Sequence, residues 1–422
     1  MDLLRELEWR ELVYDKTEGL GDALAAGPIT GYIGFDPTAS SLHVGSLLPI
    51  LLLARLQRAG HHSIALVGGG TGLIGDPSGK TQERALLTPD QVDENVDGIR
   101  AQLARFLDFD TPGNPARLIN NADWLRPYEL IPFLRDVGKH FTVNYMTAKE
   151  SVKRRLEGDE GLSFTEFSYM LLMAYDFVVL FDRFGCSLQM GGSDQWGNIT
   201  AGMDLIRKLR GARAYGLVAP LVTTTAGVKF GKTEAGTIWL DPHRTSPFHF
   251  YQFWLNTDDR DVVKYLKFFT FLDRDRIEQL ARDTAAAPER REAQRTLARA
   301  VTAMVHGEEQ VARAERAAAV LFSDGLSHAN VEDVLMVFAD APSSDVSLPP
   351  DGMPLVDLLA AVKLASSKSE ATRLVKSGGV YVNNVRAGDE RARITREDAI
   401  GGAVILLRKG RRDQHLVRIA PA

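Results

Sequence analysis

The sequence predicts an α/β protein in which a mostly parallel sheet covered by helices precedes a helical domain and a small α+β domain. Up to about residue 240, the β-type runs GYIGF, SIALV and CSLQM alternate with helical runs, which is typical of such a sheet. The segments RDVVKYLKFFTFL and RREAQRTLARAVTAMV then show helical periodicity with little strand signal. The last part has a short helix, SKSEATRLVKSG, and strands at YVNN and AVILLRKG.

These patterns predict the domain boundaries. We expect a sheet domain over 1–245, a helical domain over 246–340 and a small α+β domain over 355–422. The segment APSSDVSLPPDG is rich in Pro, Ser and Asp, so 341–354 is predicted to be a linker. In a parallel sheet, the active crevice is expected at the carboxyl ends of the strands.

Composition limits the function classes. The 422-residue chain has 45% hydrophobic and 25% charged residues and a net charge of −5, as in an ordinary globular protein of two or three domains. The single cysteine, Cys186, excludes a disulfide framework and a cysteine-based zinc site and favours a reducing compartment. Residues 1–15 lack the basic start and apolar stretch of a signal peptide, and no segment approaches the roughly 18 apolar residues of a membrane span. We therefore expect a cytoplasmic protein with no membrane partner.

Charge is distributed unevenly along the chain. Residues 351–422 carry 13 Lys and Arg against 8 Asp and Glu, whereas the rest is net acidic. A basic tail on an acidic body indicates a polyanionic partner. The alternative is a solvated surface that binds nothing.

A glycine-rich loop, GTGLIG at 70–75, follows the second strand and fits the dinucleotide fingerprint. That fingerprint needs a helix running onward from the glycines, and here Pro77 and Gly79 would break it. Asp76 would also point a carboxylate at the phosphates. The overlapping GDPSGKT has one residue too few between its glycines for a P-loop. The loop is therefore either a solvated surface turn or a site that uses Asp76 for something other than phosphate.

The helix predicted from SFTEFSYMLLMAYDF, at 163–177, should begin near Phe164, because Ser163 and Glu166 have capping-box spacing. Tyr169, Met173 and Asp176 then share one stripe of the helix. A buried acid in so apolar a helix needs a hydrogen-bond partner. Asp176 is either a satisfied core residue or part of a site.

Three more segments carry polar groups at positions suited to a site. SLHVGS, at 41–46, places a histidine and a glycine at the start of the apolar helix LLPILLLARL, where free N–H groups and a partial positive charge favour anions. GGSDQWGN, at 191–198, follows the strand CSLQM. VKFGKT, at 228–233, carries two lysines beside a glycine, and alone it would be interpreted as an exposed loop.

Taken together, HVGS, GDPSGK, YMLLMAYD, GGSDQWGN and KFGKT resemble, in this order, the bacterial tyrosyl-tRNA synthetases, which are class I aminoacyl-tRNA synthetases. The resemblance covers essentially the whole chain. It implies a Rossmann-like catalytic domain, an anticodon-side helical domain and a tail of the ribosomal-protein S-four RNA-binding type. It also implies a cytoplasmic homodimer that joins L-tyrosine to ATP, supplied with Mg²⁺, and then passes tyrosine to the 3′ end of tRNA(Tyr).

The resemblance also implies residue roles. For tyrosine it assigns the phenol to Tyr32 and Asp176, the ammonium to Asp76 and Tyr169, and the carboxylate and its surroundings to Gln195 and Asp36, with Met173 in the same pocket. For ATP it assigns the γ-phosphate to Thr38 and His43, the ribose and adenylate to Gly192 and Asp194, the helix start to Gly45 and Ser46, and the departing pyrophosphate to Lys80, Arg84, Lys229, Lys232 and Thr233. For tRNA, the basic tail residues are Lys368, Arg373, Lys376, Arg408, Lys409, Arg411 and Arg412. No metal held by protein side chains is expected.

The residue types agree with this chemistry. When a substrate carboxylate attacks the α-phosphorus, the enzyme needs no nucleophile of its own, and positioning and cations can supply catalysis. HVGS and KFGKT are then two halves of an ATP clamp, separated by some 190 residues of chain.

Three positions depart from the family pattern. Ser46 replaces a second histidine, although it can still cap the helix. Pro49 is tolerable only if it lies in the first helical turn. Met173 stands where the family commonly has a glutamine that accepts from the substrate ammonium, and a thioether is a poor acceptor.

Two alternatives share the architecture. One is the related synthetase for tryptophan, against which the pair Tyr32 and Asp176 argues, because an indole offers only an N–H donor. The other is an RNA-binding relative that has lost catalysis, against which His43 and the two lysines argue.

Overall fold

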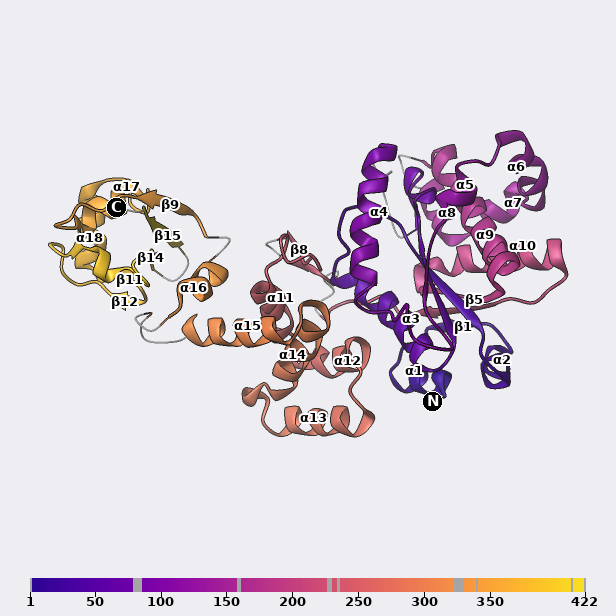
Figure 1. Ribbon diagram of the computed structural model, residues 1–422, viewed down its shortest axis with the longest axis horizontal. Coiled ribbons are helices and arrows are strands. Elements are labelled where there is room, and N and C mark those ends of the chain that lie inside the picture. Colours follow the sequence, from indigo (N-terminus) through magenta and orange to yellow (C-terminus); the bar gives the residue numbers. More distant parts are fainter. Residues whose placement is uncertain are drawn as a thin grey trace. The chain divides into compact units, whose positions relative to one another are not determined.

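The computed structural model describes residues 2–78, 86–157, 161–225, 230–233, 236–321, 326, 329–338, 341–410 and 413–420. The chain divides into two compact units (Figure 1). The first contains Met1–Thr245 and Trp254–Val305, and the second contains Ser246–Phe253 and His306–Ala422. The predicted domain boundaries remain a prediction.

The first unit is built on a six-stranded sheet of order β1-β6-β5-β2-β3-β4. Only β1 is antiparallel to its neighbour. The strands are β1 Asp15–Lys16, β2 Thr30–Phe35, β3 His62–Val67, β4 Arg117–Asn120, β5 Cys186–Gly192 and β6 Tyr215–Ala219. The predicted parallel α/β fold is therefore confirmed.

Helices cover both faces of this sheet because its central strands are apolar on both sides. On β2, Gly31 faces α3, where an added Cβ would lie 2.8 Å from Leu56. Tyr32 faces the opposite way and packs on Phe177 of α9. The helices before β6 are α1 Leu3–Trp9, α2 Leu20–Ala26, α3 Leu47–Arg58, α4 Pro89–Leu103, α5 Ala122–Leu125, α6 Leu130–Asp136, α7 Val143–Thr147, α8 Glu150–Leu156, α9 Phe164–Phe184 and α10 Trp196–Arg210.

Two of these helices begin where the sequence predicts. α9 starts at Phe164 with the Ser163 side chain accepting from the Glu166 N–H. α3 starts at Leu47, which puts Pro49 in the first turn, where it forfeits no helical hydrogen bond. α9 is also long and apolar enough to span a membrane, contrary to our expectation that no segment approaches that length. Because 61% of its most apolar window is buried, it is best explained as a core helix.

The strand order creates a switch point between β2 and β5. The chain proceeds outward from β2 to β3 and β4, and later outward from β5 to β6 on the other side. Ligands of open α/β sheets bind beyond the carboxyl ends of the strands at such a point. Asp36 directly follows β2, and Gly192 ends β5, so the fold brings these two segments together.

The remaining elements follow β6. They are β7 Lys232–Thr233, β8 Gly236–Thr237, α11 Pro247–Leu255, α12 Asp259–Phe269, α13 Arg274–Ala286, α14 Glu292–His306, α15 Glu308–Leu321 and α16 Val331–Val337. The helical periodicity predicted for this stretch is thus observed in the described residues.

The carboxyl-terminal part of the second unit is a small α+β structure. It contains β9 Ser343–Val346, β10 Met353–Pro354, α17 Leu355–Ala361, α18 Lys368–Lys376, β11 Val380–Val382, β12 Val385–Arg386, β13 Arg393–Ile394, β14 Val404–Lys409 and β15 Asp413–Ile419. The composition of 341–354 predicts a linker, but β9 pairs in parallel with β15. Ser344 explains part of the difference, because its hydroxyl bonds to the buried His415 ring at 2.9 Å.

Candidate active site

Two adjoining cavities lie at the switch point of the sheet. One has a volume of about 260 Å³ and reaches Asp176, and the other has about 510 Å³ and reaches His43. Gly45, Asp76 and Gly192 line both. This arrangement provides one crevice with a narrow inner part and a wider outer part, suited to a small substrate beside a larger one.

Asp176 lies at the inner end and is fully buried. Its carboxylate accepts from Asn121 Nδ2 at 2.8 Å and from Trp124 Nε1 at 2.7 Å. Burial raises the pKa of this carboxyl to about 7, partly offset by those two hydrogen bonds, with nearby Asp36 raising it further. Neither partner is a cation, so the carboxylate retains capacity to accept from a ligand.

Tyr32 is the second polar group at this end. Its side chain is fully buried, and its hydroxyl has no hydrogen-bond partner among the described residues. Burial and, next, the charge of Asp176 raise the pKa of Tyr32 well above its usual value. A buried hydroxyl without a partner costs free energy, and a ligand that bonds to it would recover this cost.

A chain of hydrogen bonds leads from Asp176 along the cavity. Asn121 Nδ2 also donates to Thr71 Oγ1 at 3.0 Å, and the Thr71 hydroxyl donates to Asp36 Oδ1 at 2.8 Å. The Tyr169 hydroxyl donates to the other oxygen of Asp36 at 2.8 Å. Since the Tyr169 proton is used in this way, its oxygen presents a lone pair for a further donor.

Asp76 also lines the same cavity. Its carboxylate accepts from the Ser78 N–H at 2.8 Å and from Gln195 Nε2 at 2.7 Å, and Asn198 holds the other end of the Gln195 amide at 2.9 Å. With Asp36 and Asp176, it makes three acidic side chains lining one small cavity. Such a pocket favours a cationic group.

Met173 also lines the inner cavity and is 7% exposed. Its thioether adds an apolar wall between polar groups of the same helix, Tyr169 and Asp176. The cation-binding capacity of the pocket therefore resides in its carboxylates and in Tyr169.

The outer cavity contains the HVGS segment. Val44–Ser46 form a 3₁₀ turn leading into α3, and His43 Nδ1 accepts from the Gly45 N–H at 3.0 Å. A neutral imidazole that accepts at Nδ1 carries its hydrogen on Nε2. His43 therefore caps the turn with one nitrogen and offers a donor with the other. Thr38 and Ser46 line the inner cavity, and Asp194 lines the outer one.

The structure brings HVGS next to the KFGKT segment. The Val44 N–H bonds to the Ile238 carbonyl at 3.0 Å, and His43 pairs with Trp239 in an antiparallel bridge. Gly231 has φ +80°, and a Cβ there would lie 2.6 Å from Val44 Cγ2. The backbone around KFGKT thus packs directly on HVGS, as the clamp hypothesis requires.

Some predicted phosphate-binding residues cannot be placed. Lys80, Arg84 and Lys229 lie outside the described residues, and only the backbone of Lys232 and Thr233 is described, in β7. Their assignments remain predictions. Among the residues that are described, no group of three or more His, Cys, Asp or Glu side chains could hold a metal ion.

Comparison with known proteins identifies the family. A family model described as tRNA synthetases class I (W and Y) matches residues 24–323, and one described as a tyrosine–tRNA ligase SYY-like C-terminal domain matches 333–417. A tyrosine–tRNA ligase of Roseiflexus castenholzii is 58% identical over 99% of both chains, and one of Geobacillus stearothermophilus is 53% identical over 100% of both. This chain belongs to the tyrosine–tRNA ligases.

Solved structures agree with this family. A C-terminally truncated mitochondrial tyrosyl-tRNA synthetase of Aspergillus nidulans has a TM-score of 0.68 and 32% identity, covering 76% of this chain and 94% of that one. A tryptophanyl-tRNA synthetase of Encephalitozoon cuniculi has a TM-score of 0.54 at 15% identity, covering 73% of this chain and 87% of that one, and shows the fold alone. The predicted class I synthetase family and fold are confirmed, and the tryptophan and inactive alternatives are not favoured.

The basic tail of this chain is predicted from the sequence to bind tRNA through seven residues. The structure shows the surroundings of five of them. Lys368 pairs with Asp357, Lys376 with Glu390 and Lys409 with Glu370, each at 2.9 Å. Arg408 lies 4.2 Å from the Tyr381 ring centroid, Arg373 is exposed, and Arg411 and Arg412 are outside the described residues. The pairs of Lys368 and Lys376 are solvent-accessible and therefore weak, and the role of these residues in tRNA binding stays a prediction.

Sequence analysis missed Asn121, Trp124 and Thr71, which organise the carboxylates of the pocket. A signal was present, since RLINNADW places two asparagines at the carboxyl end of β4: Asn120 is its last residue and Asn121 directly follows it. The strand-end rule that singled out Asp76 and GGSDQWGN applies equally there.

Proposed function

We propose that this chain activates L-tyrosine with ATP to form tyrosyl-adenylate and then transfers tyrosine to the 3′ end of tRNA(Tyr). The observation that carries the substrate assignment is the pair of Tyr32 and Asp176. A phenol hydroxyl can donate to the carboxylate and accept from the partnerless Tyr32 hydroxyl. An indole N–H can only donate, so it would leave Tyr32 unpaired.

The other end of tyrosine fits the acidic part of the pocket. The ammonium donates to Asp76 and to the Tyr169 oxygen. Gln195 lies near the carboxylate, and Asp36 is among the groups that surround the amino acid. This puts the carboxylate at the junction of the two cavities, near Gly192 and Asp194. ATP, as its magnesium complex, occupies the outer cavity with its α-phosphate at that junction and its ribose beside Asp194.

Chemistry then needs no enzyme nucleophile. The tyrosine carboxylate attacks the α-phosphorus, the bond to the β-phosphate oxygen breaks, and pyrophosphate leaves with growing negative charge. The donors His43 Nε2, Thr38 and Thr233 and the cations Lys80, Arg84, Lys229 and Lys232 bind that charge, an arrangement that favours the transition state over bound ATP. In the second step a ribose hydroxyl of the tRNA attacks the tyrosyl carbonyl and AMP leaves.

Two partner assignments belong to the same proposal. The tail from 355 to 422 binds tRNA through Lys368, Arg373, Lys376, Arg408, Lys409, Arg411 and Arg412. The chain acts as a cytoplasmic homodimer, for which the large exposed apolar side chains of α6, α7 and the start of α9 provide a surface: Leu130, Ile131, Val143 and, at 77% exposed, Phe164. Sedimentation of Phe164→Asp against the parent chain tests this, since a charge there should yield monomers.

The substrate proposal is tested by amino-acid-dependent ATP–pyrophosphate exchange with tyrosine, phenylalanine and tryptophan in turn. We expect exchange with tyrosine, and Tyr32→Phe should narrow the preference for tyrosine over phenylalanine. Exchange that responds to tryptophan but not to tyrosine would overturn the assignment. Unchanged discrimination in Tyr32→Phe would remove that residue from the phenol site.

A further inference from the structure

We propose that helix α12 holds the chain at two points, just before the KFGKT signature and within it, with Asp261 and Phe269 as positioning residues for adenylate formation. Asp261 contacts Thr225, and Phe269 contacts Phe230, the described residues on either side of 226–229. The inference rests on the proposed function, in which Lys232 binds the pyrophosphate, because α12 is proposed to position the segment that carries Lys232.

The amino-terminal attachment is made by a buried carboxylate. Asp261 is 6% exposed and accepts from the Thr225 N–H at 3.2 and 3.0 Å with its two oxygens, and also from the Thr225 hydroxyl. Asp261 lies in the first turn of α12, where the helix dipole favours a negative charge. Its charge is therefore supported by the helix while both oxygens are used on Thr225.

Tyr265, one turn further along α12, extends this attachment. Its hydroxyl lies 3.4 Å from the Thr223 carbonyl, so two side chains of one helix bond to the segment between β6 and KFGKT. Thr223 also lines the outer cavity. The segment therefore passes from the cavity wall to the helix immediately before the signature.

The carboxyl-terminal attachment is aromatic. The Phe230 ring is 6% exposed and stacks on Phe269 of α12, with centroids 5.2 Å apart and planes at 12°. Tyr265 and Trp254 complete the enclosure at 5.1 and 5.6 Å. Phe230 directly precedes Gly231 and Lys232 in sequence, so fixing its ring restricts the backbone that leads to Lys232.

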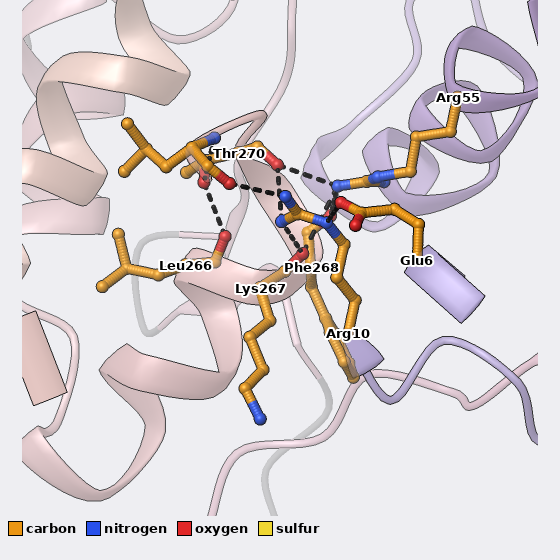
Figure 2. A network of polar contacts seen from close by, with 8 residues as sticks. Glu6, Arg10, Arg55, Leu266, Lys267, Phe268 and Thr270 are labelled. Atoms are coloured by element: carbon orange, nitrogen blue, oxygen red, sulfur yellow. Dashed lines mark hydrogen bonds and ion pairs between the residues drawn. The ribbon is translucent and has the colours of Figure 1, made fainter. Parts of the chain in front are cut away.

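The far end of α12 is fixed to α3, the helix that directly follows HVGS. Arg55, near the end of α3 and 4% exposed, donates to the carbonyls of Phe268 and Thr270, both at 2.9 Å. Arg10 donates to the carbonyls of Lys267 at 2.9 Å and Thr270 at 3.1 Å (Figure 2). Two buried cations thus satisfy the carbonyls that a helix end leaves without partners.

These contacts close a path between the two halves of the proposed clamp. The 3₁₀ turn with Gly45 leads directly into α3, and Arg55 lies near the other end of that helix. Arg55 holds the end of α12, and α12 holds Thr225 and Phe230. Because each contact is buried or part-buried, the path has little freedom. A small displacement of reacting groups costs large factors in rate, which is why a helix remote from the phosphates can control the step.

The decisive measurement is the rate of adenylate formation, by rapid quench at saturating tyrosine with ATP varied, in the full-length enzyme. We expect Asp261→Asn and Thr225→Val each to lower the maximal rate by roughly tenfold, with the tyrosine dissociation constant unchanged. Asp258→Asn is the matched control, since Asp258 caps the same helix by accepting from the Arg260 N–H and its structural role does not involve Thr225. It should leave the rate unchanged.

Combining variants separates positioning from a general structural role. If Asp261 acts through the signature lysine, Asp261→Asn should slow Lys232→Ala much less than it slows the parent enzyme. The inference would be overturned if Asp261→Asn slowed the parent enzyme and Lys232→Ala equally. It would also be overturned if Asp261→Asn and Thr225→Val had normal rates while Lys232→Ala was slow. A normal rate in Lys232→Ala would instead overturn the proposed role of KFGKT. If Asp261→Asn does not fold, Thr225→Val carries the same comparison, because it removes only the hydroxyl bond to Asp261 and keeps the bonds from the Thr225 N–H.

Discussion

Tyrosine binding should weaken as the pH falls through 7, because the group that accepts the substrate phenol is a carboxyl with a raised pKa. Burial raises the pKa of Asp176 to about 7 in the unliganded protein. About nine in ten Asp176 carboxyls are then protonated at pH 6 and about one in ten at pH 8. If only the ionised form binds the phenol, the apparent dissociation constant should rise about tenfold between pH 8 and pH 6.

The assay is equilibrium dialysis of tyrosine against the enzyme from pH 6 to pH 8 at constant ionic strength. Asp176→Asn provides a control whose weaker affinity should not vary over this range. Trp124→Phe removes a hydrogen bond that lowers the pKa of Asp176, so its midpoint should move to higher pH. A dissociation constant that changes less than about twofold in the parent enzyme would show that Asp176 stays ionised, or that its charge does not matter to the phenol.

Three further predictions concern other parts of the enzyme. Met173→Gln should lower the tyrosine dissociation constant in the same dialysis, because an amide oxygen would accept from the ammonium where the thioether cannot; an unchanged value would mean that Asp76 and Tyr169 already satisfy it. His43→Ala should slow adenylate formation by about a hundredfold and, by removing the side-chain cap of the 3₁₀ turn before α3, destabilise the protein by about 1 kcal/mol, whereas His43→Asn should restore thermal stability but not the rate. Loss of both by His43→Ala and recovery of both by His43→Asn would make this residue purely structural. Deletion of 351–422 should spare pyrophosphate exchange and cripple transfer to tRNA, with tRNA binding by the intact enzyme falling as salt rises; equal loss of both steps would make the tail structural.

Much of the fold could be predicted because its signals are local. Apolar runs of strand length and the Ser163 cap mark β2, β3, β5 and the start of α9 within a residue or two. β9 could not be predicted in this way. Its pairing with β15 joins residues some seventy positions apart, and Ser343–Val346 has the composition of a loop.

The site was only partly predictable for a related reason. Asp176 and Tyr169 share a helical stripe, so their common direction follows from periodicity. Their partners come from other strands. Asn121 and Trp124 follow β4, and nothing in the sequence of α9 indicates that β4 lies beside β3 rather than at another edge. Only the strand order brings the NNADW segment to Asp176.

The direction of hydrogen-bond donation explains why this pocket suits tyrosine at both of its ends. Asn121 donates to Asp176 and to Thr71, and Thr71 and Tyr169 then donate to Asp36. Every donor proton in this series of hydrogen bonds is therefore used inside the protein, and the oxygen atoms that remain facing the cavity are acceptors. Tyrosine brings a donor at each end, the phenol hydroxyl and the ammonium. Phenylalanine brings only one, so it would leave the Asp176 carboxylate buried without the donor that the rest of the network is arranged to require.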